Sequence, residues 1–147
     1  MSEKTSRPRH VVITGAGGAL GRAVVRHFLD EGARLALVDR HADQLAEAFP
    51  GLDNSQHLLV AADVTSESNL REAMAPVLQA FKSVDVLVHI AGGFEMGEAV
   101  HELSRDTWNR MMNLNAWSFV AAAQSVLPAM MAQCSGKVIA VTAKSAA

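Results

Sequence analysis

The sequence predicts an α/β protein with a doubly wound parallel sheet. Short runs of β-branched and aliphatic residues alternate with helical stretches along the whole chain, which is typical of βαβ units. The first of these runs leads into a glycine-rich loop that opens a helix. Because parallel strands joined by helices follow a right-handed crossover rule, we expect helices on both faces of the sheet.

The strands are predicted from short apolar runs that end at turn residues. The first run is apolar through its centre and is followed by glycine, so we expect a strand that is buried on both faces. The five predicted strands span His10–Thr14, Arg34–Val38, His57–Ala61, Val84–Ile90 and Lys137–Thr142.

The helices are predicted from apolar stripes at helical spacing and from residues that cap or end a helix. Leu20, Val24 and Phe28 form one stripe of the first helix, and Gly32 ends it. Thr65 or Ser66 can cap the third helix. The four predicted helices span Ala19–Asp30, Ala42–Phe49, Glu67–Lys82 and about Arg105–Gln133, the last capped by Ser104 and ended by Gly136.

Composition argues against several classes of protein. The hydrophobic residues make up 50% of the chain and its net charge is -2, so we expect neither disorder nor binding to nucleic acid or a membrane surface. The single cysteine, Cys134, cannot form an internal disulfide, which favours a reducing, cytoplasmic location. The histidines and the cysteine lack metal-ligand spacing, so no metal is expected.

The glycine-rich loop predicts a dinucleotide-binding site. Gly15 can supply the positive φ of a tight turn, small residues after it let the backbone approach a pyrophosphate, and Gly21 lets the helix pack close to the strand. The helix start offers N–H groups and a partial positive charge to phosphates. A purely structural turn is the alternative. The expected contacts are Gly15, Gly17, Gly18, Ala19, Leu20 and Gly21.

This loop places the cofactor site in one dinucleotide-binding Rossmann domain over residues 10–147, preceded by a flexible tail over residues 1–9. A doubly wound sheet usually continues beyond a fifth strand. We therefore expect an N-terminal part of a longer protein, and a complete five-stranded domain is the alternative.

Asp39 follows the second predicted strand and predicts the choice of cofactor. A carboxylate at this place accepts hydrogen bonds from ribose hydroxyls and repels a 2′-phosphate, so NAD(H) should be preferred over NADP(H). The neighbouring Arg40 either offsets part of that repulsion or is a solvated surface residue.

Four motifs in order give the chain a family resemblance. They are Thr-Gly-Ala-Gly-Gly-Ala-Leu-Gly at residues 14–21, Asp63-Val64 after the third strand, Ala91-Gly92-Gly93 after the fourth, and Leu114-Asn115 in the last helix. Together they resemble the short-chain dehydrogenase/reductase family. The resemblance implies that Asp63 and Val64 lie on the adenine side, although Asp63 could instead lead into a helix cap.

The same resemblance implies hydride transfer between a nicotinamide and a small-molecule carbonyl, alcohol or imine-like substrate. Asn115 would then hold a water of the proton relay, or be a helix residue bonded to backbone. The family's catalytic Ser position holds Ala143, and the chain contains no tyrosine. The family's Tyr and Lys are thus expected beyond residue 147, and this chain alone is expected to be inactive. In lacking this Ser, the chain resembles the dihydropteridine reductase-like branch of the family.

Two alternatives from other classes remain open at this point. A noncatalytic dinucleotide-binding module is favoured by the missing Ser and Tyr. A methyltransferase also places an acid on a ribose after its second strand, but the Thr14-Gly15 start and the Ala91-Gly92-Gly93 loop disfavour it.

The last predicted helix carries no charge from Met111 to Gly136. A helix that is apolar on all sides must be buried on all sides. A membrane span is disfavoured, because polar residues and a proline interrupt the ~20 apolar residues that it needs. We therefore expect the helix at residues 105–133 to pack against a second subunit, with Trp117, Met130 and Met131 in the buried patch. The family resemblance implies a homodimer or homotetramer.

Overall fold

The predicted doubly wound α/β fold is confirmed by a computed structural model, which describes residues 7–95 and 97–142. Its parallel strands form one sheet in the order β3-β2-β1-β4-β5. The order reverses direction beside β1, so the loops that follow β1 and β4 diverge and leave room for a ligand between them. The strands are β1 (His10–Thr14), β2 (Arg34–Asp39), β3 (Leu58–Ala61), β4 (Val86–His89) and β5 (Lys137–Ala140).

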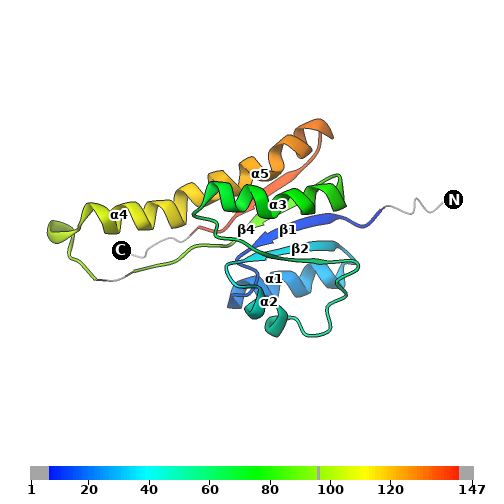
Figure 1. Ribbon diagram of the computed structural model, residues 1–147, viewed down its shortest axis with the longest axis horizontal. Helices are drawn as coiled ribbons and strands as arrows, with labels where there is room; N and C mark the ends of the chain where they lie inside the picture. The colour runs from blue at the N-terminus through cyan, green and yellow to red at the C-terminus, as the bar shows by residue number, and fades with distance from the viewer. Residues whose placement is uncertain (1–6, 96, 143–147) are drawn as a thin grey trace.

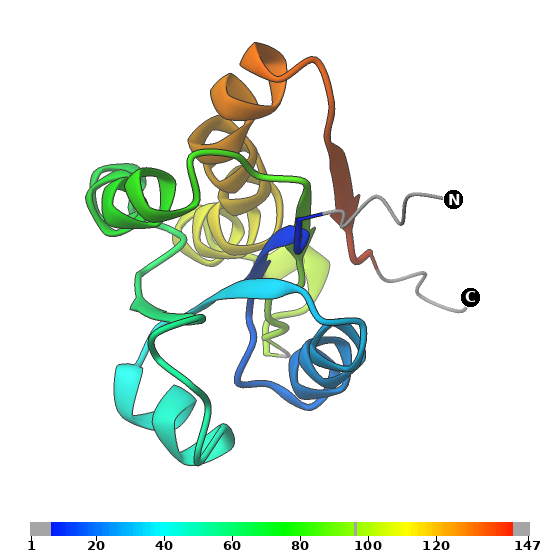
Figure 2. The same ribbon diagram turned by 90° about the vertical axis from the view of Figure 1, so that its right-hand side faces the viewer.

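Helices cover both faces of this sheet, as Figures 1 and 2 show. Alternate residues of β1 point to opposite faces: Val11 and Ile13 pack in the cluster under α1 and α2, whereas Val12 packs in the cluster under α3 and α5. Both faces of β1 are therefore buried, as its apolar sequence predicts. The helices of these layers are α1 (Ala19–Asp30), α2 (Ala42–Ala48), α3 (Glu67–Phe81) and α5 (Ser118–Ala132).

The ends of α1 and α3 follow local signals in the sequence. Gly32 adopts φ 71 after α1, as its place in the sequence predicts. Ser66 rather than Thr65 caps α3, since its side chain accepts a hydrogen bond from the Asn69 N–H. The helix ends at Phe81, one residue before the predicted end, because Lys82 takes a left-handed conformation with φ 59.

The segment predicted as a single long helix over residues 105–133 differs from that prediction in two respects. It consists of α4 (Arg105–Met112), a π-helical segment η2 (Asn113–Trp117) and then α5. Gly136 does not end it, because α5 stops at Ala132 and Cys134 takes the left-handed turn with φ 52. A side chain at Gly136 would instead clash with Met130, since a Cβ would lie 2.6 Å from the Met130 Sδ.

The uncharged run is buried on one face only, which corrects the prediction of burial on all sides. Met130 is 5% exposed and packs in the core beneath α3 and α5, so it is not available to a second subunit. Trp117 and Met131 are 45% and 73% exposed. None of the helices within the described ranges is long and apolar enough to cross a membrane.

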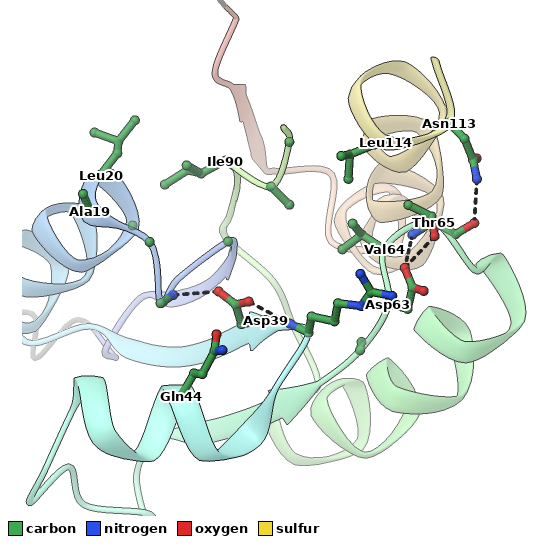
Figure 3. Close-up of a pocket in the computed structure, with 18 of the residues that line it drawn as sticks. Ala19, Leu20, Asp39, Gln44, Asp63, Val64, Thr65, Ile90, Asn113 and Leu114 are labelled. Carbon is green, nitrogen blue, oxygen red and sulfur yellow. Dashed lines mark hydrogen bonds between the residues drawn. The ribbon is translucent and has the colours of Figure 1, made fainter. Parts of the chain in front are cut away.

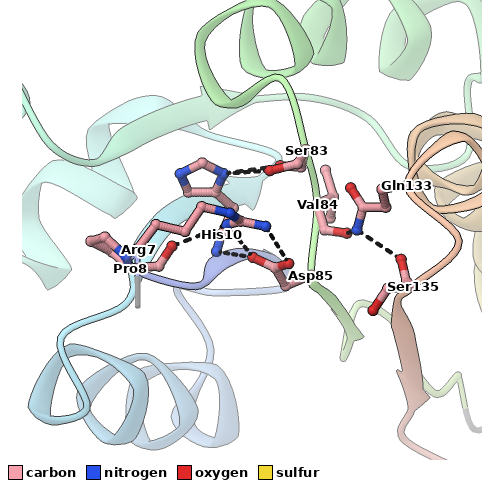
Figure 4. Close-up of polar contacts among 8 residues, drawn as sticks. All are labelled: Arg7, Pro8, His10, Ser83, Val84, Asp85, Gln133 and Ser135. Atoms are coloured by element: carbon pink, nitrogen blue, oxygen red, sulfur yellow. Dashed lines mark hydrogen bonds and ion pairs between the residues drawn. The ribbon is translucent and has the colours of Figure 1, made fainter. Parts of the chain in front are cut away.

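A polar cluster ties the beginning of β1 to the beginning of β4 (Figure 4). The Arg7 guanidinium donates two hydrogen bonds to the Asp85 carboxylate, at 2.7 and 2.8 Å. The same carboxylate accepts the His10 N–H at 2.8 Å, and Arg7 holds the pKa of Asp85 below its ordinary value, mainly through the hydrogen bond. Residue 7, the first described residue of the predicted N-terminal tail, thus contacts the domain.

Candidate functional site

A pocket of about 810 Å³ lies at the carboxyl ends of β1, β2, β3 and β4 (Figure 3). This is the edge at which doubly wound sheets bind ligands. All the predicted cofactor contacts except Gly93 line it. The lining residues are Gly15, Gly17, Gly18, Ala19, Leu20, Gly21, Asp39, Arg40, Gln44, Ala62, Asp63, Val64, Thr65, Ile90, Ala91, Gly92, Glu95, Arg110, Met111, Asn113 and Leu114.

The glycine loop is shaped by two close approaches that no side chain would permit. Gly15 has φ 68, and a Cβ on it would lie 2.7 Å from the Ala91 N. A Cβ on Gly21 would lie 2.1 Å from the Gly15 carbonyl oxygen. These contacts bring the start of α1 and the loop after β4 against the same turn. The positive φ at Gly15 and the tight packing at Gly21 match the roles predicted for them.

The start of α1 is open to an anion. Gly18 is the N-cap of this helix, and within the described residues no side chain caps it and no acidic residue occupies its first turn. The partial positive charge of the helix start is therefore not neutralised by an acidic side chain in that turn. Such a helix start, approached through small residues, suits a pyrophosphate.

Asp39, at the end of β2, is held against the glycine loop. Its Oδ2 accepts the Gly17 N–H at 2.8 Å, and its Oδ1 accepts the Arg40 N–H at 2.7 Å (Figure 3). A Cβ on Gly17 would lie 3.0 Å from Oδ2, so a side chain there would crowd this carboxylate. The backbone thus fixes a negative charge beside the helix start and inside the pocket.

Asp63 lies in the turn that follows β3, and its carboxylate holds that turn together. Its Oδ1 accepts the Thr65 hydroxyl at 2.6 Å and the Thr65 N–H at 2.9 Å. These bonds, the hydroxyl first, lower the pKa of Asp63, and the charge of Arg40 adds to the effect. The turn places Ala62 and Val64 along the pocket wall. The predicted alternative for Asp63, a residue that leads into a helix cap, describes its side-chain bonds.

Asn115 lies in the π-helical segment and holds the loop after β4. Its Oδ1 accepts the Gly93 N–H at 3.0 Å, and its Nδ2 donates to the Gly93 carbonyl at 2.8 Å and to the Met111 carbonyl at 3.0 Å. Gly93 and Asn115 thus lie beside the pocket and are hydrogen-bonded to each other. Asn113 faces a different neighbour, since its Nδ2 donates to the Thr65 carbonyl at 3.3 Å.

Several lining residues were not predicted from the sequence. Glu95 and Arg110 form an ion pair at the pocket, with the Arg110 Nη2 at 2.9 and 3.0 Å from the two carboxylate oxygens. Gln44 and Thr65 also line the wall. They stand in no motif, and only the fold brings them to the pocket.

Chemically, the described part of the site suits binding rather than proton transfer. It combines an open helix start, a fixed carboxylate and a glycine-rich loop, and the chain contains no tyrosine. Ala143, at the family's Ser position, lies outside the described residues. Over residues 7–95 and 97–142 no group of three or more His, Cys, Asp or Glu side chains could hold a metal ion.

Comparison with known proteins agrees with this geometry. The profile of a family described as short chain dehydrogenase matches residues 9–147. An uncharacterized oxidoreductase of Staphylococcus aureus is 30% identical over 87% of the chain and 55% of its own length. Dehydrogenase/reductase SDR family member 7B of Bos taurus is 36% identical over 90% of the chain and 43% of its own length.

Solved structures match in fold as well. The crystal structure of an NAD+-bound xylitol dehydrogenase superposes with a TM-score of 0.82 at 25% identity, over 90% of this chain and 52% of that one. The chain therefore spans about half the length of the relatives it matches.

Proposed function

The chain belongs to the short chain dehydrogenase family, and from this premise we propose that it forms the cofactor-binding part of an NAD(H)-dependent oxidoreductase. The observation that carries the proposal is the Asp39 carboxylate, held by the Gly17 N–H beside the open start of α1. The residues fit a dinucleotide, because the glycine loop lines the pocket without bulky side chains at Gly15, Gly17 and Gly18.

Each part of the pocket would contact a different part of such a cofactor. The start of α1, with residues 15–21, would hold the pyrophosphate, and Asp39 would accept hydrogen bonds from the adenosine ribose. Ala62, Asp63 and Val64 would border the adenine, and residues 91–93 would border the nicotinamide end. When bound, the nicotinamide supplies or accepts a hydride.

Asp39 also supports the preference for NAD(H) over NADP(H). Two charges about 4 Å apart repel by about 4 kcal/mol at an effective dielectric of ~20, and ~1.4 kcal/mol is tenfold in affinity. Arg40 reduces this repulsion to a degree. Its side chain is exposed and lowers the pKa of Asp63, so its charge is directed partly toward that second carboxylate.

The substrate would be a small carbonyl, alcohol or imine-like molecule. Asn115 orders the loop at Gly93, and the proton relay is proposed to use a Tyr and a Lys that this chain does not supply. We therefore expect no turnover by the chain alone. The noncatalytic binding module is the second candidate, and the resemblance to the dihydropteridine reductase-like branch stays a prediction.

We further propose a cytoplasmic homodimer or homotetramer built through the helix at residues 105–133. The support is the exposed apolar residues of this segment, among which Trp108, Trp117 and Met131 are all at least 45% exposed. Large exposed apolar patches are uncommon on soluble monomers. The domain is proposed to span residues 10–147, after a tail at residues 1–9.

Titration of the chain with NADH and NADPH, followed by nicotinamide fluorescence, tests the cofactor proposal. NADH should bind at least about tenfold more tightly, or ~1.4 kcal/mol. Asp39→Ala should shrink that ratio, whereas Asp43→Ala, an exposed acid in the first turn of α2, should leave it unchanged. Equal affinities for the two cofactors in the unmodified chain would refute the NAD(H) assignment.

A further inference from the structure

His89, the last residue of β4, is a buried polar residue with a partner at each ring nitrogen. It is 3% exposed. Its Nδ1 lies 2.8 Å from the Thr14 hydroxyl, and its Nε2 lies 3.2 Å from the Ser118 hydroxyl. The ring thus joins the strand before the glycine loop to the first residue of α5.

The hydrogen-bond partners allow only one arrangement of protons on this ring. The Ser118 hydroxyl donates its one hydrogen to the Leu114 carbonyl, so it accepts from His89, and Nε2 must carry the ring proton. The Nδ1 atom then accepts from the Thr14 hydroxyl. The Thr14 oxygen in turn accepts the N–H groups of Ile90 and Ala91, both at 3.3 Å.

At its Ser118 end, this series of hydrogen bonds supports the wide turn of the π-helical segment η2. The Ser118 N–H bonds to the Asn113 carbonyl, five residues back, as in a π-helix. The Leu114 carbonyl therefore lacks the N–H that an α-helix would give it, and the Ser118 hydroxyl takes that place. Asn115 lies in the middle of this turn and holds Gly93.

We propose that His89 is a positioning residue whose neutral ring keeps the glycine-loop side and the Asn115 side of the pocket in a fixed relation. This inference rests on the proposed function, since the aligned parts are those that would bind the dinucleotide. The ring acts through Thr14 on the loop at residues 90–91, and through Ser118 on the wide turn. The sequence alone shows only that a histidine stands near the end of the fourth predicted strand.

A second proton on the ring would break this arrangement. It would place an N–H on Nδ1 facing the Thr14 hydroxyl oxygen, which already accepts the Ala91 N–H and shares the Ile90 N–H with the Thr14 carbonyl. The neighbours within the described residues are uncharged: Thr14 from β1, Ser118 and Phe119 from α5, and the Val141 backbone after β5. Burial accordingly lowers the pKa of His89, so the neutral ring persists below the pH at which an exposed histidine gains a proton.

Two measurements on the chain test the proposal. Nitrogen-15 spectra of the imidazoles report tautomer and charge without cofactor. At about pH 6, where an ordinary histidine with a pKa of ~6.5 is mostly protonated, His89 should be neutral with its proton on Nε2. A ring that is charged there, or that carries its proton on Nδ1, would overturn the proposal.

NADH titration across pH, with urea unfolding alongside, separates positioning from mere stability. The side-chain amide of His89→Asn can replace Nδ1 and keep the hydrogen bond to Thr14, and that of His89→Gln can replace Nε2 and keep the hydrogen bond to Ser118. Each of these variants should weaken NADH binding about threefold. His89→Ala loses both hydrogen bonds and should weaken NADH binding about tenfold, or ~1.4 kcal/mol. These differences should shrink as acid protonates the unmodified ring. His27→Asn, at an exposed position in the last turn of α1, is the control and should match the unmodified chain.

The outcomes distinguish this inference from the proposed function. If His89→Ala lowers stability but binds NADH like the unmodified chain at every pH, the histidine is structural only and the inference fails. If the unmodified chain binds no NADH, the proposed function fails, and the imidazole spectra still decide whether the ring has the inferred state.

Discussion

Replacing Gly21 with alanine should damage the turn on which the whole pocket is built. The added Cβ would lie 2.1 Å from the Gly15 carbonyl oxygen and 2.8 Å from two Ala16 backbone atoms. An ordinary carbon–oxygen contact is about 3.3 Å, so α1 or the loop must move by about 1 Å. Both neighbours are backbone, and no flexible side chain can give way.

The expected cost follows from two opposing effects. Overpacking against rigid neighbours costs about 3 kcal/mol at the upper end of its usual range, and alanine in a helix returns about 1 kcal/mol relative to glycine. The net loss should be about 2 kcal/mol of the free energy of unfolding. With a urea slope of ~2 kcal/mol/M, the unfolding midpoint should fall by about 1 M. NADH affinity should fall about tenfold, since the N–H groups at the helix start move with the loop.

Gly18→Ala is the matched control at the same helix start. A Cβ there would meet only the Gly15 carbonyl oxygen, at 3.5 Å, and Gly18 has an ordinary φ of -71. Its unfolding free energy should stay within about 0.5 kcal/mol of the unmodified chain. If the Gly21→Ala and Gly18→Ala variants unfold at the same urea concentration, close packing of α1 on the loop does not position the site.

Three further predictions concern the rest of the fold. Asp85→Asn should lower the free energy of unfolding by about 1 kcal/mol at neutral pH, because the pair with Arg7 is lost. The folded state lowers the pKa of Asp85. The stability from this pair is therefore present above the unfolded pKa of about 4 and is lost as pH falls through the lower folded value. Urea unfolding at several pH values checks it, and a difference that persists unchanged in strong acid would contradict it. Ser66→Ala should cost about 1 kcal/mol by removing the cap of α3, and an unchanged unfolding midpoint would count against that role. Met131→Glu should leave folding intact but weaken self-association, whereas Met130→Glu should unfold the chain by burying a charge. Sedimentation of the unmodified chain as a monomer at micromolar concentration would refute the proposed interface at residues 105–133.

The sequence alone was sufficient to predict the sheet, the order of the elements and most of the pocket. Parallel strands buried on both faces are apolar throughout, and Gly15 and Gly21 stand where a side chain would collide with backbone. Asp39 is an acidic residue directly after the second apolar run, which is a pattern visible in the sequence. These features could be predicted because each belongs to a pattern of residues that are neighbours along the chain.

Only the tertiary structure showed what depends on distant partners. Met130 and Met131 are chemically identical neighbours, yet one is buried and the other is exposed, because the direction of each side chain is set by how α5 lies on the sheet. The π-helical turn at Asn115 and the bonds of His89 to Thr14 and Ser118 likewise join strands and helices far apart in sequence. Hydrogen-bond partners across a fold are chosen by packing geometry, and the identity of a residue does not specify which distant partner it will meet.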